Sequence, residues 1–285
     1  MDCFASLAMT SSIDMYLRIG GAPLYVRIAG DGAPLLLLHG GGPGTSGEGW
    51  REVMELLAPH HRVIAPDYPG FGHSAIPGTA PGIGRLAELM LELMGTLCID
   101  RAAFAGHSMG AIVGATVATR APQRVSHLAL VAPGGGTYGV QYESPGIAAI
   151  ARAAQEPSEA NVRAVVELMS ARPELIDAEV NKRMKFLERP GIVEIQRQLA
   201  AARGDSKARA AEPPSALGDK VRGLDLPIAL LWGEHERFNP GEIGPKIHAA
   251  LPAQAGYHVI PGAGHNAQYD RPEIVAAILR GFLAR

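Results

Sequence analysis

The segment at residues 104–110 reads Phe-Ala-Gly-His-Ser-Met-Gly, and it most constrains how this chain can fold. An apolar run at 102–105 leads into it, and small residues with helical spacing follow at 109–120. The glycines two positions before and after Ser108 let the backbone turn sharply from strand to helix, which leaves the serine hydroxyl exposed at the sheet edge. The segment therefore predicts a nucleophilic serine in an architecture of alternating strands and helices.

A second glycine-rich segment, His-Gly-Gly-Gly-Pro-Gly at 39–44, follows the apolar run at 35–38. Consecutive glycines leave backbone N–H groups uncovered, which suits an oxyanion hole. We expect the donors to be Gly41 or Gly42 together with the N–H of Met109, at the start of the helix after the serine. A phosphate-binding loop would need a lysine before Thr45, where Gly44 stands.

Two further strand-end loops carry an acid and a histidine. The predicted strand at 228–231 is followed by Gly233, Glu234 and Glu236, and a strand at 258–260 leads into Gly-Ala-Gly and His265. A carboxylate can hold an imidazole in the tautomer that accepts a serine proton. Both glutamates are candidates for this acid, and Glu234 stays the alternative to Glu236.

The chain order of serine, acid and histidine resembles that of the α/β-hydrolase fold. The resemblance extends from Ile13 to Arg285. The segment Asp-Tyr-Pro-Gly-Phe-Gly-His-Ser at 67–74 matches the loop after the fourth strand in many such enzymes. The resemblance implies an α/β fold in which helices flank a mostly parallel eight-stranded sheet and a helical lid is inserted. It also implies a serine hydrolase that acts on a small-molecule substrate without a cofactor or metal ion.

Within that superfamily, residues 39–44 and 264–270 are similar to the meta-cleavage-product hydrolases. These enzymes hydrolyse a carbon–carbon bond in 2-hydroxy-6-oxo-dienoates, the ring-opened products of aromatic degradation. The resemblance implies a triad of Ser108, His265 and Glu236, and an arginine in the lid for the substrate carboxylate. The implied substrate-binding residues are His107, Arg183, Phe238 and Asn266.

The chain departs from that group at three positions. His107 stands where asparagine is usual, Asn266 where tryptophan is usual, and Glu236 where aspartate is usual. The first two changes fall in the substrate pocket, so a carboxylesterase or lactonase acting on a small ester is the alternative function. A more remote alternative is a hydrolase-fold protein that binds a ligand without turnover.

The pattern of apolar runs predicts one α/β core with a helical insertion. Residues 13–135 and 223–285 are assigned to the core, and 136–222 to the lid, where proline-punctuated helices are expected at 148–154, 159–170 and 178–187. We expect the stretch at 200–214 to be the end of a lid helix or a mobile loop. Strands are predicted at 15–19, 25–29, 35–38, 63–65, 102–105, 128–131, 228–231 and 258–260, and core helices at 49–57, 84–97, 109–120, 245–251 and 272–283.

Composition excludes several other classes of function. The net charge of −2 gives no electrostatic footprint for nucleic acid or an anionic membrane, and no apolar run approaches the length of a membrane span. Residues 1–12 lack a basic, apolar signal and are expected to form a disordered extension. Cys3 and Cys98 have no metal-binding spacing, so Cys98 is expected to be buried and the location cytoplasmic. The resemblance is compatible with a homodimer.

Overall fold

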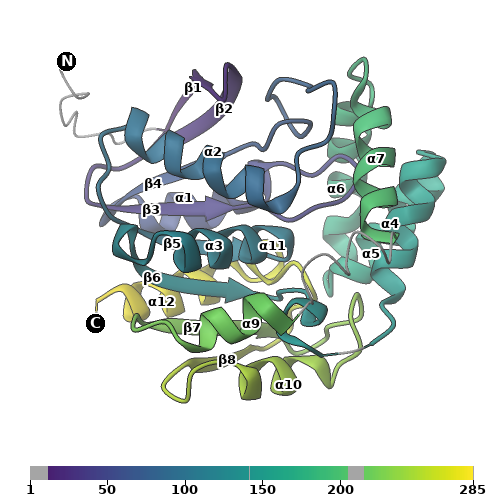
Figure 1. The fold of residues 1–285 in the computed structure, drawn as a ribbon. Helices are drawn as coiled ribbons and strands as arrows, with labels where there is room; N and C mark the ends of the chain where they lie inside the picture. Colours follow the sequence, from purple (N-terminus) through teal and green to yellow (C-terminus); the bar gives the residue numbers. More distant parts are fainter. Residues whose placement is uncertain (1–11, 141, 205–214, 285) are drawn as a thin grey trace.

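Eight strands form one sheet whose order is β1-β2-β4-β3-β5-β6-β7-β8 (Figure 1). This computed structural model describes residues 12–140, 142–204 and 215–284. β1 pairs antiparallel with β2 and β2 with β4, whereas every later pair is parallel. The predicted mostly parallel eight-stranded sheet is confirmed. The strands are β1 (Ile13–Ile19), β2 (Ala22–Ala29), β3 (Ala33–Leu38), β4 (His61–Pro66), β5 (Ala102–His107), β6 (Val125–Val131), β7 (Ile228–Gly233) and β8 (Gly256–Ile260).

Helices cover both faces of the sheet, and the four leucines of β3 show why. Leu36 and Leu38 belong to a buried cluster with α2 and α3, whereas Leu35 and Leu37 belong to a second cluster with α1 and α12. A strand in contact with helices on both faces needs apolar residues at successive positions, as β3 has. The core helices and turns are η1 (Gly47–Trp50), α1 (Arg51–Leu57), α2 (Ile83–Thr96), α3 (Met109–Arg120), η2 (Pro122–Arg124), α10 (Ile243–Ala250), α11 (Ala267–Asp270) and α12 (Pro272–Leu283).

Between β6 and β7 the described residues form helices and no strand. Four of these helices, α4 to α7, gather at the end of the sheet where the parallel strands terminate (Figure 1). The next one, α9, instead packs against α3, and its Val221 is buried in the core cluster. The elements are η3 (Gly135–Tyr138), α4 (Pro145–Gln155), α5 (Glu159–Met169), α6 (Pro173–Leu187), α7 (Ile192–Gly204) and α9 (Ser215–Arg222).

The sequence pattern located most elements but not all. Each predicted strand and core helix is present, and α3 and α12 have the predicted bounds. The helices α9 and α11 were not expected, because α11 is one turn long and α9 follows two prolines. Residues 200–204 form the end of α7, one of the two alternatives stated for 200–214. The predictions for residues 1–11 and 205–214 lie outside the described residues.

The prediction that Cys98 is buried is wrong, because this residue is exposed. It follows the end of α2 with a positive φ of 56°, and the chain there turns toward β5. The buried neighbours Leu97 and Ile99 fill the apolar positions in its place.

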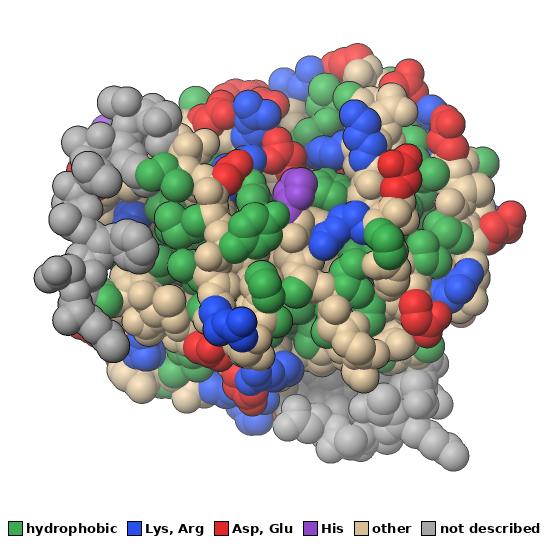
Figure 2. Space-filling model, turned by 90° about the horizontal axis from the view of Figure 1, so that it is seen from above, with side chains coloured by type: hydrophobic (Ala, Val, Ile, Leu, Met, Phe, Trp, Pro, Cys, Tyr) green, Lys and Arg blue, Asp and Glu red, His purple; other side chains and the backbone are tan. Residues whose placement is uncertain are grey.

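The molecular surface carries mixed charge. On the face shown in Figure 2, Lys and Arg side chains are interspersed with Asp and Glu, in keeping with the net charge of −2. None of the helices in the described ranges is long and apolar enough to cross a membrane.

Candidate active site

Ser108 lies in a strained turn between β5 and α3. Its backbone angles are φ 51° and ψ −112°, a conformation that non-glycine residues rarely adopt. Its N–H donates to the carbonyl of Val131 at 2.8 Å, which fixes the turn to β6. A Cβ at Gly106 would overlap the Gly110 carbonyl, and one at Gly110 would overlap Leu38, so the turn requires both glycines.

His265 and Glu236 form a buried pair on the loops after β8 and β7. His265 Nδ1 lies 2.8 Å from Glu236 Oε2, and each side chain is 1 % exposed. The other carboxylate oxygen, Oε1, accepts the N–H groups of Phe238 at 2.8 Å and Asn239 at 3.0 Å. Because a carboxylate accepts, Nδ1 donates to Glu236, and in the neutral ring the lone pair is therefore on Nε2. No described residue pairs with this buried Nε2.

Glu234 takes a different position from Glu236. Its side chain is half exposed, and its Oε2 accepts the N–H of Gly262 at 2.9 Å and lies 3.5 Å from His235 Nε2. Of the two glutamates proposed from the sequence, only Glu236 contacts His265.

The glycine-rich loop after β3 is held in place by a buried histidine. His39 Nδ1 donates to the carbonyl of Gly40 at 2.7 Å, and Nε2 accepts the N–H of Tyr68 at 3.0 Å. Burial lowers the pKa of His39 to about 4, so the ring is neutral and fills both roles. Gly42 has a φ of 127°, which a side chain would strain. The predicted donors Gly41, Gly42 and Met109 are all buried, and Met109 is the first residue of α3.

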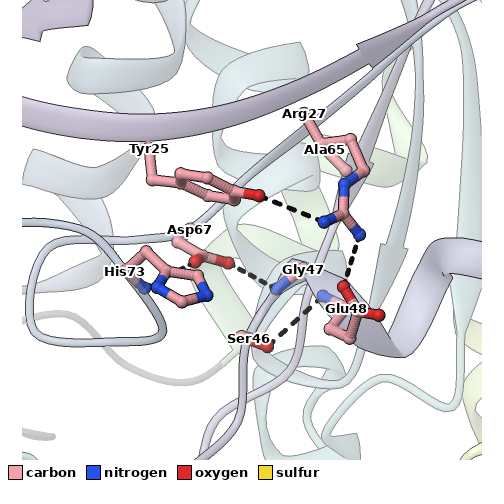
Figure 3. Close-up of a pocket in the computed structure, with 8 residues that line it drawn as sticks. All are labelled: Tyr25, Arg27, Ser46, Gly47, Glu48, Ala65, Asp67 and His73. Carbon is pink, nitrogen blue, oxygen red and sulfur yellow. Dashed lines mark hydrogen bonds and ion pairs between the residues drawn. The ribbon is translucent and has the colours of Figure 1, made fainter. Parts of the chain in front are cut away.

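A buried aspartate anchors the far end of the same loop (Figure 3). Asp67 Oδ1 accepts the N–H of Gly47 at 2.6 Å, and Oδ2 accepts the N–H of His73 at 2.8 Å. Burial raises the pKa of Asp67 to about 6, although both hydrogen bonds act to lower it. Arg27 beside it is paired with Glu48 and Asp14. These residues tie the glycine-rich loop to the loop after β4.

A polar cavity lies beside the glycine-rich loop, and Arg183 of α6 is one of the residues that line it. The Arg183 side chain is 2 % exposed, and its Nε donates to Glu179 Oε1 at 2.7 Å. Its Nη1 is buried and has no partner among the described residues. The lining comprises His39, Gly40, Thr45, Ser46, Gly49, Trp50, His107, Glu179, Lys182, Arg183, Asn266, Gln268 and Tyr269.

The charges around this cavity sum to one excess positive charge. Glu179 pairs with both Lys182 and Arg183. Burial alone would raise the pKa of Glu179, but the two cations outweigh burial and lower it. One carboxylate thus offsets one of two cations, and the remaining positive charge suits a singly charged anion.

The other substrate-binding candidates lie around the His265 ring. His107 Nε2 lies 3.0 Å from the carbonyl oxygen of His265, and Phe238 stacks on the His265 ring at 4.2 Å between centroids. Phe238 is not among the residues that line the polar cavity, whereas His107 and Asn266 are. The structure therefore places three of the four candidates, including Arg183, on one cavity.

Sequence reasoning did not identify Glu179, Lys182, Gln268 or Tyr269 as cavity residues, because their positions depend on how α6 and α11 pack. It also missed the role of Asp270, whose buried carboxylate accepts from Ser170 Oγ and from the N–H groups of Ala171 and Gly264. These bonds tie the His265 loop to the end of α5. Within the described residues, no group of three or more His, Cys, Asp or Glu side chains could hold a metal ion.

Comparison with known proteins places the chain in a family. The model of the α/β hydrolase fold matches residues 34–272. A dihydrolipoyllysine-residue acetyltransferase component of an acetoin cleaving system from Pseudomonas putida is 34% identical over 94% of this chain and 68% of its own length. A 2-hydroxy-6-oxo-2,4-heptadienoate hydrolase, also from Pseudomonas putida, is 29% identical over 97% of this chain and 98% of its own.

A solved structure shows the same fold. The 2-hydroxy-6-oxo-6-phenylhexa-2,4-dienoate hydrolase from Rhodococcus sp. strain RHA1 has a TM-score of 0.86 and 24% identity, covering 96% of this chain and 99% of that one. The predicted resemblance to meta-cleavage-product hydrolases is confirmed by these relatives. The chain belongs to the α/β hydrolase fold family and is an enzyme.

Proposed function

We propose that this enzyme is a serine hydrolase that cleaves a carbon–carbon bond in a 2-hydroxy-6-oxo-dienoate. The observation that carries the proposal is the buried Nε2 of His265, which has no partner in the described part of the chain and whose ring Glu236 orients through Nδ1. Ser108, on its strained turn, is the proposed nucleophile. The similarity to hydrolases of this substrate class supports the choice of substrate.

In the proposed mechanism the dienol first ketonises by gaining a proton at C5. The bond to be cleaved then lies between the electrophilic C6 carbonyl and a saturated carbon that a C=C bond links to the new ketone. His265 Nε2 then takes the Ser108 proton while Oγ attacks the C6 carbonyl. The N–H of Met109 and a backbone N–H of Gly41 or Gly42 stabilise the oxyanion, each such donor contributing roughly 3 kcal/mol.

Collapse of this intermediate breaks the carbon–carbon bond, and its electron pair passes to the ketone as an enolate that takes the proton from His265. Water, with His265 again as base, then hydrolyses the acyl group from Ser108. The net reaction adds one water across the bond and needs no other reactant.

The polar cavity supports an acidic substrate. Arg183 Nη1 is a buried donor without a partner among the described residues, and the cavity retains one excess positive charge. A buried charged donor left unpaired is costly, so a substrate carboxylate bound to Arg183 would be strongly favoured. We therefore assign Arg183 as the carboxylate anchor.

The test compares a coloured 2-hydroxy-6-oxo-dienoate, followed by loss of its visible absorbance, with a short-chain nitrophenyl ester. We expect kcat/KM for the dienoate to exceed that for the ester. Arg183→Ala should raise KM for the dienoate about tenfold or more and leave the neutral ester nearly unchanged. Arg197→Ala, an exposed arginine on α7, is the matched control.

A small ester or lactone is the second candidate substrate. His107 and Asn266 line the cavity in place of the residues usual in meta-cleavage-product hydrolases, and the same three catalytic groups would hydrolyse an ester. A preference for the ester, with equal losses on both substrates in Arg183→Ala, would favour this candidate over carbon–carbon cleavage.

A further inference from the structure

The Arg183 side chain is held by the protein at both of its ends. Its backbone packs against the glycine-rich loop, since a Cβ at Gly44 would come within 2.4 Å of the Arg183 carbonyl oxygen. Its guanidinium is held at Nε, which donates at 2.7 Å to Oε1 of Glu179, one turn earlier on α6. The side chain therefore has a defined direction as well as a charge.

The three nitrogen atoms of the guanidinium have different surroundings. Nε donates to Glu179, and Nη2 donates to the sulfur of Met169 at 3.4 Å, which is a weak acceptor. Nη1 is buried, has no partner in the described part of the chain, and lies 3.9 Å from a Cβ built on Gly42. Because the guanidinium is planar, the bond at Nε restricts where Nη1 can point. The bond to Glu179 thus directs the free donor toward the glycine-rich loop.

Glu179 is an unexpected neighbour for a site that binds an anion. Its buried side chain lines the same cavity as Arg183. Burial acts to raise the pKa of its carboxyl, but Arg183 and Lys182 together lower it, so the group is ionised at neutral pH. A carboxylate here repels a bound carboxylate. Its presence is explained if the orientation of Arg183 contributes more to anion binding than this repulsion costs.

We propose that Glu179 is a positioning residue, whose Oε1 holds the Arg183 guanidinium so that Nη1 is presented to a carboxylate in the cavity. The inference rests on the proposed function, since it assigns a second residue to the anchoring of the substrate carboxylate. An arginine already held in one orientation loses less conformational entropy when an anion binds. Lys182, paired with Oε2, offsets the negative charge that Glu179 brings into the cavity.

The test measures binding of hexa-2,4-dienoate and of its neutral amide, hexa-2,4-dienamide, by calorimetry on the intact protein. Glu179→Gln and Glu179→Leu both lack the charge, but only glutamine can accept from Arg183 Nε. We expect Glu179→Gln to bind the acid about tenfold more tightly than Glu179→Leu, the effect of one hydrogen bond to a charged group. The two variants should bind the amide with affinities within about twofold of each other.

A second comparison shows whether Glu179 acts through Arg183. In an Arg183→Ala background, the Gln and Leu variants of Glu179 should bind the acid equally, because the group that they orient is gone. Glu188, an exposed residue at the end of α6, provides the matched control. Glu188→Gln and Glu188→Leu should bind the acid as tightly as the wild type does.

If Glu179→Leu does not fold, NMR of the wild type decides. The Nε–H of Arg183 should exchange slowly with solvent in the free protein and stay protected when hexa-2,4-dienoate is added. An Nε–H that becomes protected only with the acid bound would show that the ligand, and not Glu179, orients the guanidinium. That result would overturn the inference.

Equal binding of the acid by Glu179→Gln and Glu179→Leu would also overturn the inference, as would a difference between them that persists in the Arg183→Ala background. Equal losses for acid and amide would assign Glu179 a structural role only. A wild type that does not prefer the acid to the amide would contradict both the anchor and the inference. Because neither probe is cleaved, the expected differences in an enzyme that does not hydrolyse the dienoate would contradict the proposed reaction alone.

Discussion

The two ring nitrogens of His265 face different surroundings, and Glu236 is the reason. Both carboxylate oxygens of Glu236 are occupied, one by His265 Nδ1 and the other by two backbone N–H groups. The carboxylate is thereby held in one rotamer, although glutamate is one methylene longer than the aspartate usual in the related hydrolases. The orientation of His265 thus depends on this one side chain.

Replacing Glu236 by alanine should therefore lower kcat by about 10³- to 10⁴-fold, because the imidazole loses its tautomer and orientation. Glu234→Ala, which removes an exposed carboxylate on the same loop, should change kcat less than about threefold. Steady-state kinetics of both purified variants would check this. The opposite order of losses would assign the acid to Glu234.

At the scale of elements, specific contacts join the helices between β6 and β7 to the loops that carry Glu236 and His265. The N-terminus of α4 binds the acid loop, where Ser144 Oγ and Gly146 N–H both donate to the carbonyl of Phe238. Asp270 joins the end of α5 to the His265 loop. A shift of α4 or α5 would consequently move groups that touch His265.

Gly146→Ala tests this connection. A Cβ at Gly146 would overlap the ring of Phe238, which stacks on His265, so the ring must move. We expect the free energy of unfolding to fall by about 1–3 kcal/mol and kcat to fall with it. Gly241→Ala is the control, because no described atom outside its own chain neighbours lies within 4 Å of the added Cβ. Wild-type stability and kcat in Gly146→Ala would contradict the connection.

The buried carboxylate of Asp67 predicts that the free energy of unfolding depends on pH. Its pKa in the folded state is raised to about 6, so folding favours the protonated form. The contribution of Asp67 to the free energy of unfolding is fully present below about pH 4, the pKa of an aspartate in the unfolded chain. This contribution is lost as the pH rises through about 6.

Asp67→Asn removes this titration. The free energy of unfolding of the wild type, minus that of Asp67→Asn, should therefore fall by up to about 3 kcal/mol between about pH 4 and pH 7. Urea unfolding across this range measures it, with the exposed Asp100→Asn as control. A difference that stays constant or rises with pH would show that Asp67 does not titrate in this way.

At the scale of the whole molecule, the sheet and the loops of the proposed triad could be predicted from the sequence because both depend on local signals. Buried parallel strands such as β3 and β6 read as apolar runs, and glycines mark the turns after them. Parallel strands then bring the ends of β3, β5, β7 and β8 to one edge, so Ser108, Glu236 and His265 could be proposed together.

The polar cavity could not be predicted in the same way. Glu179 and Lys182 face it only because α6 packs across the glycine-rich loop, and Gln268 lies on a helix of one turn. The contact of His107 Nε2 with the His265 carbonyl joins segments that lie 158 residues apart in the sequence. Such contacts between distant segments have no periodic signal. The prediction for Cys98 was wrong for a local reason, because the chain turns there with a positive φ.

The rate of dienoate hydrolysis by Ser108→Ala, relative to the wild type, tests the central claim most directly. The substitution removes one hydroxyl at a turn that already tolerates a side chain, so folding should be unaffected. We predict that kcat falls at least about 10⁴-fold while the dienoate still binds. Hydrolysis by a folded Ser108→Ala within about tenfold of the wild-type rate would contradict a mechanism that begins at Ser108.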